Sequence, residues 1–231
     1  MKTMADQINQ AQLTLSRLFP RIQKEFPQID TRTAEWKNFK QRLEEHFPQL
    51  FELLLHIYGS NYDFFYHLEQ LLFVIVRMWL DRDPELKKLD KQRSADPAWF
   101  KSNRMLGGVC YVDLFAKNLK GIEKRIPYFK ELGLNYLHLM PLFKCPKGNN
   151  DGGYAVSSYR EVNPALGKMS DLKNLAANLR EEGISLVLDF VFNHTSDEHE
   201  WAMKAKEGDL TCQNFYWIFP DRKTPDAYER N

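Results

Sequence analysis

Apolar side chains in the first 80 residues recur three and four positions apart, which is the spacing of one face of a helix. One such set runs from Trp36 to Ile57, a second from Phe64 to Trp79, and an earlier one from Leu15 to Ile22. Gly59 supplies a stop after the first set, and Pro20 is expected to bend or interrupt the earliest helix. This part of the chain is therefore predicted to be all-helical, with most of its apolar residues in a core.

Residues 81–97 are dense in charge, carry two prolines and contain no aromatic residue. This composition is typical of a connection between domains, although Leu86 and Leu89 would anchor a short helix there. The sequence thus predicts a helical domain over residues 1–90 and a second domain over residues 91–231.

After Trp99 the pattern changes from helices alone to strands alternating with helices. Short apolar runs rich in strand formers predict strands over 108–115, 135–140 and 186–192. Helical spacing predicts a helix over 119–132 that ends at Gly133, and another that Ser170 caps and Gly183 ends. Strands joined through helices by short connections imply parallel pairing with right-handed crossovers, hence an α/β fold.

Two segments of this second domain stand apart from the alternation. Residues 142–168 form an oversized loop, and such loops in compact domains are usually functional or disordered. Residues 213–220 are rich in aromatic side chains and are expected to form a loop that packs over another part of the protein.

Charge and cysteine content narrow the classes of protein. Lys and Arg number 32 against 31 Asp and Glu, a net charge of +1, so no basic excess points to nucleic acid or to an anionic membrane. The three cysteines, Cys110, Cys145 and Cys212, form no C-x-x-C pair, which favours a reducing compartment over a disulfide framework or a zinc site. Residues 1–12 lack the apolar core of a signal peptide, and no apolar run is long enough to span a membrane. A cytoplasmic location is expected.

The strand over 186–192 carries the clearest candidate chemistry. Its apolar run is typical of a parallel strand buried on both faces, and a single carboxylate, Asp189, interrupts it. The strand then leads into a polar segment that starts at Asn193 and His194. In α/β barrels, loops at the carboxyl ends of strands build the active site. The pattern alone is equally compatible with a buried strand followed by a solvated turn.

Residues 189–194, DFVFNH, resemble the first signature region of glycoside hydrolase family 13, the α-amylase superfamily. Four further segments resemble the amylosucrase branch of that family: residues 107–115, 132–146, 151–167 and 214–229. The resemblance implies the first three βα units of a (β/α)8 barrel, preceded by a helical region. It also implies an enzyme that cleaves sucrose with retention and transfers the glucosyl unit to an α-glucan, without a cofactor.

Site residues follow from the resemblance one by one. His194 matches the histidine that hydrogen-bonds glucosyl hydroxyls, Asp151 a carboxylate at the bottom of the sugar pocket, and Tyr154 the ring on which the sugar stacks. Asp189 is expected to support a later arginine, because a buried carboxylate needs a partner. Without the resemblance, residues 151–153 (Asp-Gly-Gly) would simply indicate a turn.

Other readings of the same polar segment are weaker. His194 and His199 flank two acidic residues, but no H-E-x-x-H motif supports a zinc site. Asn193 occupies a position that ligates calcium in many α-amylases, yet no other ligand is evident, and no metal is predicted. Asp197 and Glu198 are adjacent acids without a role in the family pattern, and we expect them on the loop surface.

The family's nucleophilic and acid/base carboxylates would lie beyond Asn231, so the sequence indicates an N-terminal portion of such an enzyme. A complete barrel alone needs about 250 residues. The 231-residue chain is therefore expected to lack glucosyl transfer and to aggregate through its unpaired strand edge. A sucrose hydrolase or α-glucosidase of the same family, or a non-catalytic carbohydrate-binding or interaction protein, remains an alternative; the oligomeric state is open.

Overall fold

The computed structural model describes residues 4–230 of the chain. Residues 1–3, which belong to the stretch examined for a signal peptide, lie outside the described part. Contacts divide the chain into two units, Met1–Asp96 and Pro97–Asn231. Within the described residues, no helix combines the length and the apolar character that crossing a membrane requires.

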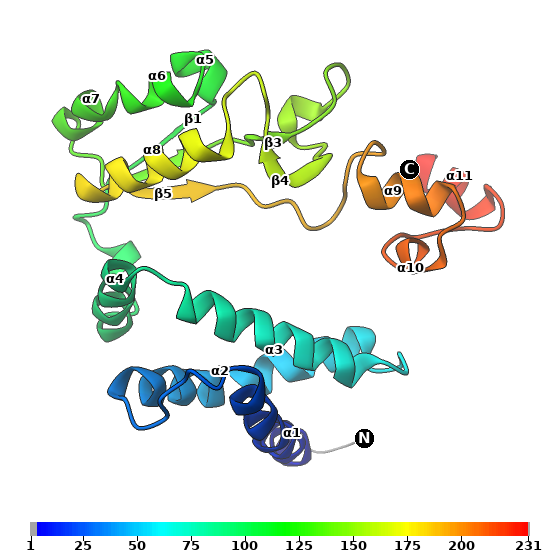
Figure 1. Ribbon diagram of the computed structural model, residues 1–231. Coiled ribbons are helices and arrows are strands. Elements are labelled where there is room, and N and C mark those ends of the chain that lie inside the picture. Colours follow the sequence, from blue (N-terminus) through cyan, green and yellow to red (C-terminus); the bar gives the residue numbers. More distant parts are fainter. Residues whose placement is uncertain (1–3, 231) are drawn as a thin grey trace. The chain divides into compact units, whose positions relative to one another are not determined.

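Unit 1 is entirely helical. Its elements are α1 (Met4–Glu25), α2 (Ala34–Tyr58), α3 (Phe64–Leu80) and α4 (Pro84–Ala95), coloured from blue to green in Figure 1. The expected interruption at Pro20 is wrong, because α1 continues through it. Leu18 and Ile22, on either side of Pro20, are both buried in the core. Packing of this face outweighs the one backbone hydrogen bond that proline removes.

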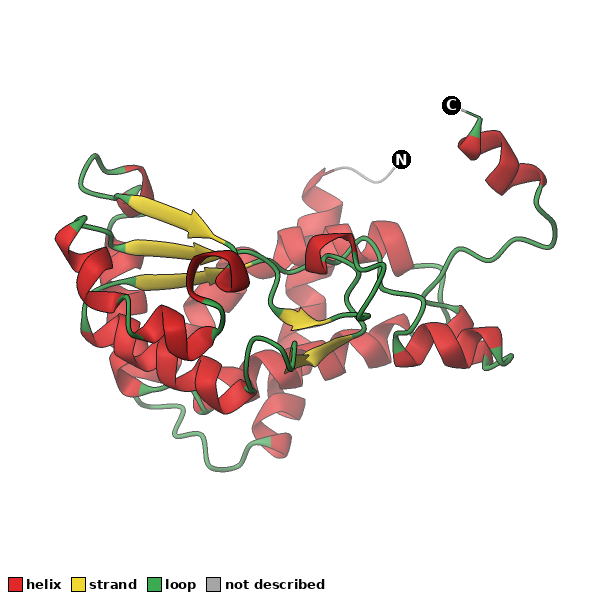
Figure 2. Cartoon of the chain, turned by 90° about the horizontal axis from the view of Figure 1, so that it is seen from above, coloured by secondary structure: helices red, strands yellow, loops and turns green. Residues whose placement is uncertain are grey.

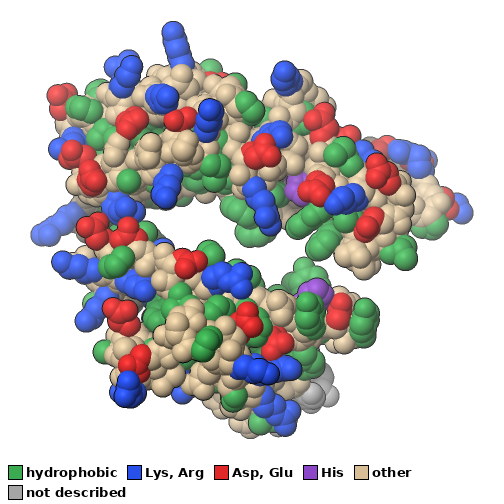
Figure 3. Space-filling model, in the orientation of Figure 1, with side chains coloured by type: hydrophobic (Ala, Val, Ile, Leu, Met, Phe, Trp, Pro, Cys, Tyr) green, Lys and Arg blue, Asp and Glu red, His purple; other side chains and the backbone are tan. Residues whose placement is uncertain are grey.

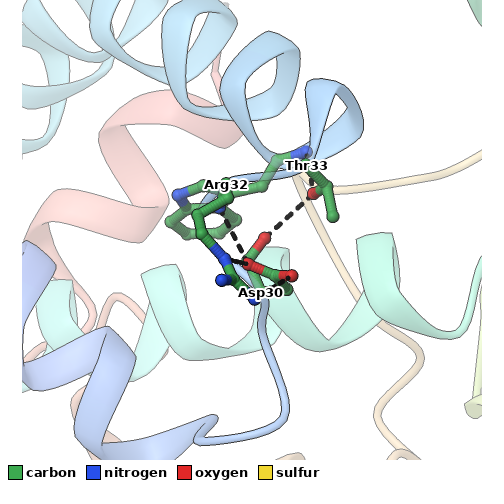
Figure 4. A network of polar contacts seen from close by, with 4 residues as sticks. Asp30, Arg32 and Thr33 are labelled. Atoms are coloured by element: carbon green, nitrogen blue, oxygen red, sulfur yellow. Dashed lines mark hydrogen bonds and ion pairs between the residues drawn. The ribbon is translucent and has the colours of Figure 1, made fainter.

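The turn that leads into α2 is built from short-range polar contacts (Figure 4). Asp30 accepts hydrogen bonds from the backbone N–H and from the guanidinium of Arg32, with its Oδ1 3.0 Å from Nε. Thr33 caps the helix, since its Oγ1 accepts from the backbone N–H of Trp36 at 3.2 Å. The hydrogen bonds from Arg32 lower the pKa of the exposed Asp30 carboxyl.

The core of unit 1 is contributed mainly by the first three helices. Its largest fully buried side chains are Phe47, Phe51, Ile22 and Leu72. Towards the end of α2 the predicted core face is only partly correct, because Leu53 and Ile57 are exposed. The short helix expected in the charged connection, residues 81–97, is confirmed as α4, none of whose residues is buried.

Among the described residues, unit 2 contains a parallel sheet, an antiparallel ribbon, seven α-helices and two short 3-10 turns. The sheet strands are β1 (Gly107–Cys110), β2 (Tyr136–Leu139) and β5 (Ser185–Leu188), and the ribbon strands are β3 (Phe143–Lys144) and β4 (Ser158–Val162). The α-helices are α5 (Val112–Ala116), α6 (Leu119–Glu123), α7 (Ile126–Glu131), α8 (Met169–Glu181), α9 (Glu200–Lys206), α10 (Leu210–Gln213) and α11 (Lys223–Glu229). Short 3-10 turns η1 (Trp99–Lys101) and η2 (Asp151–Gly153) complete the unit.

The sheet has the strand order β1-β2-β5 with every pair parallel, as the sequence predicted. Figure 2 shows its three strands side by side, and Figure 1 shows α6 and α8 on the same side of the sheet. Leu137 and Leu139 of β2 are fully buried in a cluster that also includes Leu175 and Leu179 of α8. The core therefore lies between the sheet and these helices.

Two predicted elements before β2 are longer than the real ones. The strand expected over 108–115 ends at Cys110, which pairs with Leu139, the last residue of β2, so the ladder has no partner further on. The chain then forms helix α5 instead. The helix expected over 119–132 is split into α6 and α7, since Pro127 lacks the N–H that a continuous helix would use and serves instead in the first turn of α7.

Of the two predicted ends of helix α8, one is correct and the other is not. Gly183, which follows α8, has φ +75°, a left-handed conformation that glycine adopts without strain, so this predicted helix end is confirmed. The cap predicted at Ser170 is wrong, because the helix begins at Met169 after Lys168. The Asp171 carboxylate accepts from the backbone N–H of Lys168 at 2.9 Å and replaces a capping side chain.

Residues 142–168 are not a structureless loop. Strands β3 and β4 pair antiparallel within it, and η2 lies between them. The sequence pattern missed the ribbon because β3 has only two residues.

The last sheet strand is also shorter than predicted. It ends at Leu188, so Asp189 is the first residue after the strand and does not interrupt it. Phe190 and Phe192 are 53% and 87% exposed, so burial on both faces is wrong for this part of the run. Among the described residues, the stacked ring of Tyr159 covers Phe190 only in part, and Phe192 stays largely exposed.

Charges of both signs are interspersed on the face shown in Figure 3, over each unit. Several form ion pairs within their own unit, such as Lys144 with Glu161 and Arg82 with Asp90. No basic patch gathers on this face, in keeping with the balanced composition.

Candidate functional site

A group of polar side chains gathers at the carboxyl ends of the parallel strands. Tyr111 follows β1, His138 is the third residue of β2, and Asp189 follows β5. Parallel strands bring their carboxyl ends to one edge of a sheet, which explains why residues so distant in sequence meet there.

The Asp189 carboxylate has a hydrogen-bond partner on each oxygen. His138 Nε2 lies 3.0 Å from its Oδ1, and the Tyr154 hydroxyl donates to its Oδ2 at 3.3 Å. The side chains of His138 and Asp189 are 25% and 23% exposed, so most of each is buried and the remainder is accessible to water. The carboxylate was expected to need a partner, and within the described residues it has two, His138 and Tyr154; the later arginine that it was expected to support stays a prediction.

Tyr154 reaches Asp189 from the turn at η2. Asp151, Gly152 and Gly153 all have positive φ, of 51°, 65° and 96°, so the turn expected from the Asp-Gly-Gly sequence is confirmed. Asn150 stabilises it: its Oδ1 accepts from the Gly153 N–H at 3.1 Å, and its Nδ2 donates to the Pro146 carbonyl at 2.9 Å. Glycine is required in the turn, because side chains rarely adopt these angles.

Electrostatics keep the Tyr154 hydroxyl protonated. Its pKa is raised, first by burial and then by the negative charge of Asp189, with smaller contributions from Tyr111 and Asp151. A protonated phenol is the form that donates to the carboxylate. His138, Tyr154 and Asp189 therefore form one polar group, and Asp151 has an exposed carboxylate three residues before Tyr154.

His138 was missed by the sequence reasoning, although a signal was present. It alternates with the buried Leu137 and Leu139 in β2, so its side chain must lie on the other face of the strand. A histidine two residues from the end of a predicted parallel strand is positioned to join the residue that follows a neighbouring strand.

His194 and Asn193 lie further along the same segment and are both exposed. The Asn193 amide donates to Nδ1 of His194 at 2.7 Å. Among the described residues, the hydrogen bonds of the His194 ring are with this neighbour and not with the Asp189 group. Of the five predicted site residues, the structure therefore joins Tyr154 and Asp189 by a hydrogen bond and places Asp151 in the turn that carries Tyr154.

The remaining polar residues of this segment serve the surface and helix α9. Asp197 and Glu198 are exposed, as expected, and Asp197 pairs with Lys206 at 3.3 Å. His199 is buried and caps α9, where its Nδ1 accepts from the Trp201 N–H at 3.2 Å. Within the described part of the chain, no three His, Cys, Asp or Glu side chains are arranged to hold a metal ion.

Acidification is expected to loosen α9 through His199. Burial lowers the pKa of His199 below its ordinary value of 6.5, and the weaker opposing effect comes from Glu200. The unfolded segment therefore binds a proton more readily than the folded one. The stability that neutral His199 contributes is complete at pH values above the ordinary pKa. It declines as the pH falls from the ordinary pKa towards the lowered pKa. The protection factor of the Trp201 amide, its exchange rate corrected for the intrinsic pH dependence, should therefore fall between pH 7.5 and pH 5.

His199→Asn is the matched variant, because asparagine caps helices well and does not titrate in this range. The protection factor of its Trp201 amide should not fall over this pH range. An equal loss of protection in the variant and the wild type would exclude His199 as the cause.

The three cysteines are free thiols. Burial raises the pKa of Cys110, Cys145 and Cys212, so they stay protonated near neutral pH. Activated cysteine nucleophiles have lowered pKa values, so these thiols are not candidates for covalent catalysis.

The aromatic tail packs less than predicted. Phe215 stacks on Trp201 with ring centroids 4.5 Å apart, and the Tyr216 hydroxyl lies 3.0 Å from Thr195 Oγ1. Trp217, however, is 91% exposed and Ile218 is 56% exposed. Within the described residues, only the first part of the tail packs over another segment.

Comparison with known proteins places these features in a family. Residues 95–231, more than half of the chain, match the family model described as alpha amylase, catalytic domain. An oligo-1,6-glucosidase of Parageobacillus thermoglucosidasius is 36% identical over 115 residues, which is 48% of this chain and 20% of that protein. An alpha-glucosidase of Apis mellifera is 36% identical over 105 residues, 46% of this chain and 18% of that protein.

Among solved structures, a variant of isomaltulose synthase from Erwinia rhapontici NX5, in complex with its natural substrate sucrose, has 27% identity and a TM-score of 0.47. That likeness covers 53% of this chain and 22% of the other. The chain thus spans about a fifth of the length of the curated relatives it matches. On the strength of the match over residues 95–231, the chain belongs to the alpha-amylase family, and its parallel sheet and helices are part of that family's (β/α)8 barrel.

Proposed function

We propose that the chain is the N-terminal portion of an enzyme that acts on α-glucosyl compounds, and that unit 2 forms part of its glucosyl-binding pocket. One observation carries the proposal. The polar group of His138, Tyr154 and Asp189 lies at the carboxyl ends of the sheet strands, inside the region that matches the catalytic domain. This is where barrel enzymes hold their substrates.

In this proposal Asp151 and Tyr154 bind the sugar ring from one side. Asp151 offers an exposed carboxylate, which accepts hydrogen bonds from hydroxyl groups. The Tyr154 hydroxyl is held by Asp189, so its ring has one orientation and presents a face for stacking on the sugar. Asp189 thereby acts through Tyr154, with His138 on its second oxygen.

His194 is proposed to bind glucosyl hydroxyls from the segment that follows β5, with Asn193 supporting it. The Asn193 amide occupies its Nδ1, which leaves Nε2 to carry the proton and to donate. An exposed imidazole of fixed tautomer suits a neutral, hydroxylated ligand.

No catalytic carboxylate is assigned to these residues. Retaining glycoside cleavage needs two carboxyl groups about 5 Å apart, one as nucleophile and one as acid/base. Asp189 has a partner on both oxygens, and Asp197 pairs with Lys206 on the surface. We therefore place the nucleophile and the acid/base outside residues 1–231.

Sucrose is proposed as the donor and an α-glucan as the acceptor, as in amylosucrases, on the basis of the sequence segments that resemble this branch. The names of the relatives favour a second candidate, an α-glucosidase, in which water accepts the glucosyl unit. A protein that contains these residues and converts sucrose to polymer supports the first candidate. Release of free glucose alone supports the second.

The purified 231-residue chain should bind sucrose or maltose saturably but without turnover. We expect dissociation constants in the millimolar range, about −4 kcal/mol, since the residues supply only part of a pocket. Intrinsic tryptophan fluorescence or NMR shifts measure the binding, and assays for glucose, fructose and glucan measure the turnover. Asp151→Ala should weaken binding by about tenfold through loss of a charge-assisted hydrogen bond.

Asp197→Ala removes an exposed carboxylate of the surface and is the matched control, with no expected effect on binding. A folded wild-type chain without saturable sugar binding would contradict the proposed pocket. Steady turnover would show instead that the reacting carboxylates are among these residues.

A further inference from the structure

Tyr159 of β4 joins the antiparallel ribbon to the segment that carries His194. Its hydroxyl donates to the Val191 carbonyl at 2.6 Å, and the His194 carbonyl lies 3.2 Å away. One hydroxyl proton serves both acceptors, and the shorter contact takes the larger share. The chain between residues 191 and 194 is therefore held at both ends by one side chain.

The ring of Tyr159 is held as well as its hydroxyl. It stacks on Phe190 with centroids 5.2 Å apart and an interplanar angle of 23°. The rings of Phe143 and His199 lie 6.3 Å and 5.8 Å away. Stacked rings with a fixed hydroxyl leave Tyr159 little freedom to release the segment.

A second contact between the same two segments lies next to this one. The Ser196 N–H donates to the Val156 carbonyl at 2.8 Å, and both residues are buried. Tyr159 of β4 and Val156, two residues before that strand, thus hold the segment before and after His194. The segment has no regular secondary structure of its own between β5 and α9, so these contacts determine its path.

We propose that Tyr159 is a positioning residue for the sugar site, which sets the path of residues 190–196 and thereby the place of the His194 imidazole. This rests on the proposed function, in which His194 binds the glucosyl ring. In this role Tyr159 does not contact the substrate itself. It acts through the two backbone carbonyls and through Phe190.

Tyr159→Phe tests the proposal, because it removes the hydroxyl and keeps the ring. The buried Ser196 amide is the reporter, and its hydrogen exchange should become about tenfold faster, the effect of losing one hydrogen bond on local opening. The Met140 amide, which donates to Cys110 between β1 and β2, should be unaffected. Sugar affinity should fall severalfold, and Tyr159→Leu, which also removes the stack, should lower it further.

Tyr128→Phe is the matched control, since Tyr128 is a half-exposed ring on α7 that contacts Phe115 and Phe129. Unchanged Ser196 exchange in Tyr159→Phe would overturn the proposal, and so would faster exchange with unchanged sugar affinity. If the wild-type chain binds no sugar, the proposed function fails, whereas the exchange result still decides whether Tyr159 sets the path of the segment.

Discussion

Leu139→Ala is expected to lower the free energy of unfolding of unit 2 by about 3 kcal/mol. Leu139 is fully buried in the central strand of the sheet, in the same cluster as Leu175 and Leu179 of α8. Truncation removes three carbon atoms from a site enclosed by strands on both sides, which cannot collapse to fill the space. The loss therefore includes both the transfer of the side chain and the cavity.

Hydrogen exchange of the slowest β2 amides measures this loss for unit 2 alone, and the slowest α3 amides of unit 1 provide an internal reference. Leu114→Ala is the matched control, because Leu114 of α5 is 81% exposed and its truncation should change stability by less than about 0.5 kcal/mol. Equal effects of the two variants would show that Leu139 does not lie in a packed core.

Gly153→Ala is expected to cost about 2 kcal/mol in the turn that carries Asp151 and Tyr154. Gly153 has φ +96°, a conformation that side chains rarely adopt, and a Cβ there would lie 3.2 Å from both Cβ and the carbonyl oxygen of Pro141. The strain is relieved by opening the turn. The Ala155 N–H, which donates to the Asn150 carbonyl at 3.0 Å, should then exchange roughly thirtyfold faster.

Gly148→Ala lies in the same connection and is the matched control. A Cβ at Gly148 meets no atom within 4 Å, so this variant should be neutral or slightly stabilising. If the two variants have the same Ala155 exchange rate, the geometry of the turn does not depend on Gly153. Under the proposed function, only Gly153→Ala should also weaken sugar binding, because it displaces Tyr154 from Asp189.

Local pattern was sufficient for most elements of the fold. Apolar spacing located the long helices α2 and α3, and the alternation of strands and helices predicted the parallel sheet. Glycines at helix ends were informative because their left-handed conformation is a local property, as Gly183 shows. The same holds for the turn at η2.

Boundaries and partners could not be predicted in the same way. The end of β1 depends on where β2 ends, and the split between α6 and α7 depends on how the chain meets the sheet. The ribbon of β3 and β4 was missed because pairing over two residues leaves no periodic signal. In the site, motif resemblance identified Asp151, Tyr154 and Asp189 as candidates but did not indicate what they contact.

By itself, the sequence determined the helical first unit, the parallel sheet of the second and membership of the alpha-amylase family, which the family match confirms, because periodicity and short motifs are properties of neighbouring residues. Only the tertiary structure decided that Asp189 lies beyond its strand with His138 as partner, 51 residues earlier in the chain. It likewise decided that Tyr159 holds the His194 segment from the ribbon. These contacts depend on strand order and register, which bring distant residues together at one edge of the sheet.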